Sequence, residues 1–98
     1  MYALAVIRYR RPVEEVLKHH PAHREYLQGL KQRGFLVFSG PLEPRFGGAA
    51  VLRLPDDQMP DLLDTIRDND PYVKNRVAQW EVMIWNVGTG KEDLDSLQ

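Results

Sequence analysis

The sequence predicts an α+β domain whose elements follow one another in the order β-α-β-β-α-β. Four short runs rich in strand-forming residues alternate in this order with two amphipathic helical patterns. This is the split βαβ or ferredoxin-like arrangement, which makes one four-stranded antiparallel sheet. The chain has 98 residues, enough for one such domain and not for two. We expect the domain to span residues 1–87 and a polar C-terminal tail to span 88–98.

The first third of the chain supplies a strand and a broken helix. Residues 2–9 (YALAVIRY) are apolar and predict a first strand buried on both faces over most of its length. A helical pattern follows over 13–33, but Pro21 interrupts it, because a proline inside a helix removes a hydrogen bond and costs roughly 3 kcal/mol. We therefore predict a short helical turn at 12–19 and a main helix from Pro21, ended by Gly34.

The rest of the chain supplies three strands and a second helix. Residues 35–39 and 48–54 predict the second and third strands, joined by a turn that contains glycine and proline. One of the two aspartates after Pro55 is expected to cap a helix with an apolar face, and Pro71 is expected to stop it. Residues 77–87 alternate between apolar and polar side chains and predict the fourth strand.

Composition excludes several classes of function. The chain has no cysteine, which excludes disulfides, zinc–thiolate sites and thiol nucleophiles. Its net charge of −1 provides no basic surface for nucleic acid or an anionic membrane. No apolar run is long enough to span a bilayer and no signal-peptide pattern precedes the first strand, so we expect a cytoplasmic protein. A core this small is marginal, and help must come from good packing or from a second copy of the chain.

The predicted topology brings distant residues together at one end of the domain. With right-handed crossovers, the start of the main helix, the end of the second strand and the end of the second helix lie at the same end. His23, the Ser39-Gly40-Pro41 turn and Asp70 are therefore expected to converge there. The inference comes from connectivity and not from periodicity alone.

The chemistry of this group suits a general acid–base unit. Histidine titrates near neutrality and can take and give a proton, and a carboxylate bonded to one ring nitrogen fixes its tautomer. In this interpretation Asp70 supports His23, and Ser39 orients a substrate. The structural alternatives are a core or interface histidine, an aspartate that stops a helix, and a turn that only connects strands. Tyr72 either lines the cleft or caps the helix end.

Two further features admit a second interpretation. His20 and His23 are three residues apart on one helical face and invite a metal site. Pro21 disturbs that geometry and no third ligand is evident, so we predict no metal. Arg8 is placed at the mouth of the cleft, where it would meet a substrate carboxylate, although charged strand ends are usually only solvated.

The ordered motifs resemble the YCII-related (YciI-like) family over roughly residues 2–86. They are His20-Pro21-Ala22-His23, Ser39-Gly40-Pro41 and Asp70-Pro71-Tyr72. The resemblance implies a dimeric α+β barrel, in which two four-stranded sheets pack face to face, and a pocket whose catalytic histidine and aspartate correspond to His23 and Asp70. Relatives include a dehydrochlorinase, and similar barrels include muconolactone isomerases and cofactor-free monooxygenases. The residue before Pro-Ala-His is commonly arginine in the family and is His20 here, which bears on the charge preferred in a substrate.

Three hypotheses for the function follow. The first is a small cofactor-independent enzyme of the lyase or isomerase kind, in which His23 moves a proton of a small cyclic or carbonyl metabolite. The second is a non-catalytic dimer that binds a small metabolite in the same cleft, and the third is a structural dimer. The expected partners are a second copy of the chain and a small molecule, with no nucleic acid, membrane, cofactor or metal. The expected substrate-binding residues are Ser39, Gly40, Pro41, Tyr72, Arg8 and His20.

Overall fold

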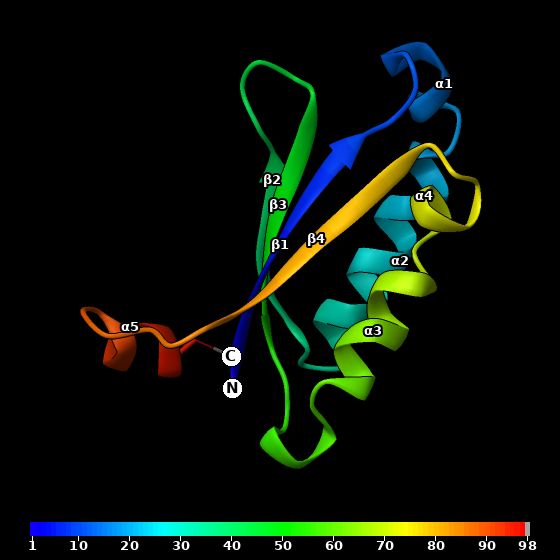
Figure 1. Cartoon of the computed structure of the whole chain (residues 1–98). Coiled ribbons are helices and arrows are strands. Elements are labelled where there is room, and N and C mark those ends of the chain that lie inside the picture. Colours follow the sequence, from blue (N-terminus) through cyan, green and yellow to red (C-terminus); the bar gives the residue numbers. More distant parts are fainter. Residues whose placement is uncertain (98) are drawn as a thin grey trace.

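The computed structural model describes residues 1–97 and contains one four-stranded antiparallel sheet, as the sequence predicts. The elements are β1 (Tyr2–Tyr9), α1 (Val13–Leu17), α2 (His20–Gln32), β2 (Leu36–Pro41), β3 (Gly47–Arg53), the 3₁₀ turn η1 (Asp56–Gln58), α3 (Asp61–Asp68), α4 (Pro71–Lys74), β4 (Ala78–Trp85) and α5 (Lys91–Asp95). The sheet order is β2-β3-β1-β4, so the α+β, ferredoxin-like prediction is confirmed. Helices α2 and α3 lie on one face of the sheet, and α5 lies beyond the other (Figure 1).

The central strand β1 divides the core from an open face. It pairs antiparallel with β3 on one side and with β4 on the other. Successive side chains of a strand point to opposite faces, and Ala3, Ala5 and Ile7 are buried in the main core beneath the helices. Leu4 and Val6 point to the open face and are half-buried. The prediction of burial on both faces is therefore confirmed on the helix side. On the open face, Tyr2 is buried but Leu4 and Val6 are only half-buried.

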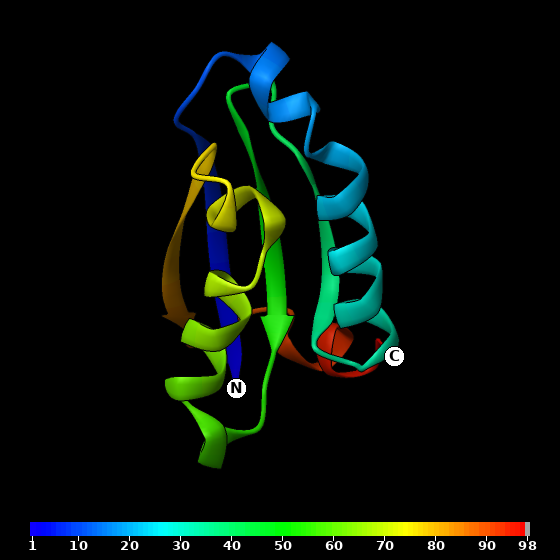
Figure 2. The ribbon, with the colours of Figure 1, turned by 90° about the vertical axis from the view of Figure 1, so that its right-hand side faces the viewer.

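The break in the first helical segment is confirmed. Helix α1 ends at Leu17, and α2 begins at His20 with Pro21 in its first turn. Backbone N–H groups in the first turn have no acceptor within the helix, so a proline there costs no hydrogen bond. Gly34 follows α2 with φ of +83°, the left-handed conformation that glycine adopts without steric cost. Figure 2 shows α2 and α3 side by side across the sheet. The N-terminus of α2 is thus carried to the end of the sheet where the site forms.

The second helical segment differs from the prediction at its start. An aspartate was expected as its cap, but α3 begins only at Asp61, after Pro60, with no side-chain cap. The aspartates at 56 and 57 form η1 instead, also without a cap bond, so that prediction is wrong. Strand β2 also continues through Pro41 instead of ending before Gly40. An edge strand tolerates proline because the missing N–H need not face a neighbour.

Two short helices in the C-terminal third were not predicted. Helix α4 follows directly after Asp70. Helix α5 lies in the segment predicted to be a loose tail; Leu94 packs on a small cluster of the open face, and the Tyr2 hydroxyl donates to Asp95 Oδ1 at 2.6 Å. Gln98, the last residue of that predicted tail, lies outside the described residues. No helix within residues 1–97 has both the length and the apolar character needed to cross a bilayer.

Candidate active site

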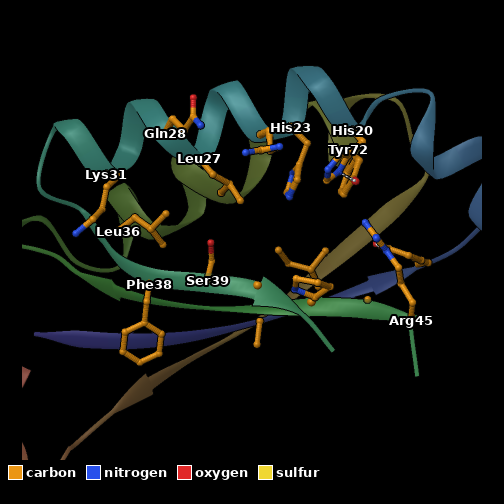
Figure 3. A pocket seen from close by; sticks show the side chains of 18 of the residues that line it. His20, His23, Leu27, Gln28, Lys31, Leu36, Phe38, Ser39, Arg45 and Tyr72 are labelled. Atoms are coloured by element: carbon orange, nitrogen blue, oxygen red, sulfur yellow. Dashed lines mark hydrogen bonds between the residues drawn. The ribbon is translucent and has the colours of Figure 1, made fainter. Parts of the chain in front are cut away.

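A cavity of about 580 Å³ lies between α2 and the β2–β3 side of the sheet. Apolar side chains form much of its wall, including Ile7, Leu27, Leu36 and Val37. Figure 3 shows His23 on the helix side of this space and Ser39 on the sheet side. A volume of this size is typical of small-molecule sites, which are mostly apolar with a few placed polar groups.

His23 and Asp70 form a buried pair beside the cavity. The His23 Nδ1 and Asp70 Oδ1 atoms are 2.7 Å apart, and Asp70 is 0 % exposed. A carboxylate offers only acceptors, so Nδ1 is the protonated ring nitrogen and donates this bond. The other ring nitrogen, Nε2, is then free of the proton in the neutral ring. Because His23 lines the cavity, Nε2 is the atom available to a bound molecule.

Asp70 is held by donors from three separate elements. Its Oδ1 accepts from His23 on α2 and also from the backbone N–H of Tyr72 at 3.2 Å, which makes Asp70 the N-cap of α4. Its Oδ2 accepts from Trp80 Nε1 on β4 at 2.7 Å. Within residues 1–97, no buried side-chain nitrogen or oxygen lacks a hydrogen-bond partner. The carboxylate can stay buried because both of its oxygens are satisfied.

Tyr72 fixes the plane of the His23 ring. The two rings are stacked with centroids 3.8 Å apart and planes 5° from parallel. Burial, followed by the charge of Tyr9, raises the pKa of Tyr72 to about 12, so its hydroxyl stays protonated. That hydroxyl lies 3.0 Å from His20 Nδ1. Burial and then the neighbouring Arg45, His23 and Arg24 lower the pKa of His20 below its usual 6.5, so a neutral His20 accepts this bond.

Two residues at the end of the cavity next to His20 were not identified from the sequence. Tyr9 contacts Tyr72 edge-on, with ring centroids 6.1 Å apart. Arg45, on the loop between β2 and β3, donates from Nε to the Tyr9 hydroxyl at 3.3 Å. Both line the cavity, where Arg45 is exposed. No local motif marks Arg45, since a charged residue in a Pro- and Gly-containing loop is ordinary turn chemistry.

The structure brings together most of the predicted site. Five of the predicted substrate-binding residues line the cavity with His23, namely His20, Ser39, Gly40, Pro41 and Tyr72. The sixth, Arg8, does not: it lies outside the lining and pairs with Glu81 at 3.1 Å. Because Ile7 faces the helices, its neighbour Arg8 must point to the opposite face of the sheet. Placing Arg8 at the mouth of this cavity was therefore wrong.

Comparison with known proteins supports a family assignment. The model of the YCII-related domain matches residues 1–86. The chain belongs to the YCII-related family. This YCII-related chain is also similar to a solved structure, the 5-chloro-2-hydroxyhydroquinone dehydrochlorinase from Burkholderia phenoliruptrix AC1100 in complex with 2,5-dihydroxybenzoquinone. The TM-score is 0.73 at 22 % identity, over 90 % of this chain and 96 % of that one, which establishes a shared fold. A search of the curated proteins gives no match.

Proposed function

We propose that this YCII-related chain is a cofactor-independent acid–base enzyme acting on a small cyclic or carbonyl-containing metabolite, and that it works as a homodimer. The observation that carries the proposal is the buried His23–Asp70 pair on the wall of a cavity large enough for such a molecule. The dehydrochlorinase of similar fold was solved with 2,5-dihydroxybenzoquinone, a small cyclic carbonyl compound, which supports the same substrate class here.

The reaction begins with proton abstraction by His23. Nε2 takes a proton from a carbon next to a carbonyl group, and the electron pair of that C–H bond moves to form an enolate. His23 becomes an imidazolium whose Nδ1–H is bonded to Asp70, which orients the ring and stabilises its charge. Where a further C=C bond is conjugated with the enolate, returning the proton to the far carbon of that bond shifts the double bond and completes an isomerisation. Alternatively, the enolate re-forms the carbonyl and expels an anionic leaving group from the adjacent carbon, which completes an elimination.

The residues facing His23 position the substrate. Ser39 projects from β2 into the cavity on the side opposite α2 (Figure 3), so its hydroxyl is placed to bind a substrate oxygen. The backbone of Gly40 and Pro41 continues the same wall. Tyr72 keeps the plane of the His23 imidazole constant through stacking. The Tyr72 hydroxyl is itself hydrogen-bonded to His20. A base held in a fixed orientation accelerates the reaction more than a mobile one, because less conformational freedom is lost on reaching the transition state.

The open face of the sheet supports dimerisation. It carries large apolar side chains that water still reaches, including Phe38 at 55 %, Met83 at 43 % and Trp85 at 47 % exposure. A contiguous apolar face on a small domain marks an interaction surface, and the family resemblance implies packing of two such sheets. Sedimentation is expected to show a dimer for the wild type and a monomer for Met83→Asp. A monomeric wild type at micromolar concentration would overturn this part of the proposal.

The acid–base role is tested by deuterium exchange, which needs no knowledge of the natural substrate. Cyclohexanone and 2-oxobutyrate are incubated with the protein in D₂O, and loss of the proton next to the carbonyl is followed by NMR. We expect exchange above the buffer rate with the wild type and with the control His19→Gln, whose histidine does not line the cavity. His23→Gln should abolish it. Equal exchange in His23→Gln, or none above buffer in any sample, contradicts a general base at this position.

A further inference from the structure

The cavity is lined by charges of one sign. Three cationic side chains, Arg24, Lys31 and Arg45, contribute to its wall, and its described lining contains no aspartate or glutamate. The whole chain is balanced, with 13 lysines and arginines against 14 aspartates and glutamates. The cavity wall is therefore positive although the chain as a whole is balanced. A wall with three cations and no carboxylate favours a ligand that carries negative charge.

Arg45 offers hydrogen-bond donors in the geometry that a carboxylate requires. Its Nε is used by the Tyr9 hydroxyl, which steadies the side chain. Within the described residues, its two terminal amino groups donate to no protein acceptor. A guanidinium is a planar fork that can bind both oxygens of a carboxylate at once. The loop between β2 and β3 thus presents an anchored arginine with unused donors at the cavity.

The surroundings of His20 show that the same end of the cavity is electropositive. Two arginines act on His20, Arg45 from the β2–β3 loop and Arg24 from α2, and both carry positive charge. The remaining group at hydrogen-bond distance is the neutral Tyr72 hydroxyl. Burial first, and then the charge of Arg45, holds the pKa of His20 below its usual value. An anion placed here would be attracted by both arginines, while the carboxylate of the site, Asp70, is already paired with His23.

We propose that the cavity binds a small organic anion, and that Arg45 receives its carboxylate or enolate group while its carbon skeleton rests on the apolar wall beside His23. Figure 3 shows Arg45 and Lys31 at opposite ends of the cavity with His23 between them. A ligand anchored at the Arg45 end therefore extends past the base. The inference deepens the proposed function by naming the charge of its substrate, and it rests on that function for the role of the same cavity.

The test compares acids with their neutral amides of nearly equal shape. Binding of benzoate and benzamide, and of acetate and acetamide, is measured by NMR titration at constant ionic strength. We expect at least one acid to bind the wild type roughly 10-fold more tightly than its amide, which is the contribution of a charge-assisted hydrogen bond. Arg45→Gln should lose most of this preference. Arg11→Gln removes the same charge from an exposed position outside the cavity lining and should retain it.

Three results would overturn the proposal. These are equal binding of acid and amide, no binding of either acid, and an acid preference that survives Arg45→Gln unchanged. This test can fail without affecting the acid–base role, because exchange of the neutral cyclohexanone depends on His23 and not on an anion. Conversely, a protein that prefers acids but catalyses no exchange would support the anion site and contradict the acid–base activity. The two proposals are therefore distinguished by separate measurements.

Discussion

Replacing Asp70 with asparagine tests whether this carboxylate stabilises the fold. It accepts three hydrogen bonds, two at Oδ1 from His23 and the Tyr72 backbone and one at Oδ2 from Trp80. An asparagine has one acceptor oxygen and one NH₂ group in the same space. Whichever way the amide is turned, its NH₂ group faces at least one buried N–H donor. One donor or more therefore loses its acceptor.

The expected loss of stability can be estimated from these bonds. A buried donor without a partner costs about 1–3 kcal/mol. The bonds that remain change from charge-assisted to neutral, which weakens each by about 1 kcal/mol. A neutral amide is less costly to bury than a carboxylate, and this offsets part of the loss. The net expectation is a decrease of about 2–4 kcal/mol in the free energy of unfolding, a large share of the roughly 5–15 kcal/mol typical of a domain.

Urea unfolding at one fixed protein concentration measures this change, because any dimer couples stability to concentration. Asp57→Asn is the matched control, since Asp57 is exposed and the same substitution there is expected to shift stability by at most about 0.5 kcal/mol. Nitrogen-15 NMR of His23 is the second measurement. We expect the proton on Nδ1 in the wild type and a redistribution between the two ring nitrogens in Asp70→Asn.

One outcome would refute this reasoning. If Asp70→Asn is as stable as the wild type, or more stable, the three hydrogen bonds do not offset the cost of burying the carboxylate. Asp70 would then be a residue that the fold tolerates and does not need. An unchanged His23 tautomer in the variant would further show that Asp70 does not determine which ring nitrogen of His23 carries the proton.

Four substitutions test other parts of the structure. In Gly47→Ala, a Cβ would lie 1.9 Å from the Ile7 carbonyl oxygen, so we expect roughly 3 kcal/mol of destabilisation in urea. Gly29→Ala, on a helix with open space around it, should instead stabilise by about 1 kcal/mol. Burial and then the Asp70 charge raise the pKa of Tyr26 to about 12. The unfolded chain therefore loses this proton first, stability should fall as the pH rises from 10 to 12, and Tyr26→Phe should flatten that fall. The pKa of His20 is lowered, so the unfolded chain takes up this proton first as the pH drops below 6.5. Stability should decline there, and less so in His20→Asn; unchanged pH profiles would contradict both assignments.

Local rules were sufficient for much of the fold. The break before Pro21 and the stop at Gly34 follow from a missing N–H and from a left-handed backbone, which are properties of single residues. Apolar runs of strand length located all four strands. The predicted start of the second helix was wrong because either aspartate after Pro55 made a plausible cap. No local feature of the sequence excluded the 3₁₀ turn that forms there. Helix α5 depends on its contact with the open face, which lies far away in sequence.

The meeting of His23 with Asp70 was determined by the sequence, because the order of elements and the handedness of their connections leave one end of the domain for both. Tertiary structure alone decided which face of β1 points to the helices. Residues on both faces of that strand are apolar, so alternation cannot choose between them, and Arg8 was assigned to the wrong side. Packing also decided that Trp80 completes the hydrogen bonds of Asp70 and that Arg45 reaches the cavity. Such contacts depend on side-chain directions in three dimensions, which no spacing along the chain encodes.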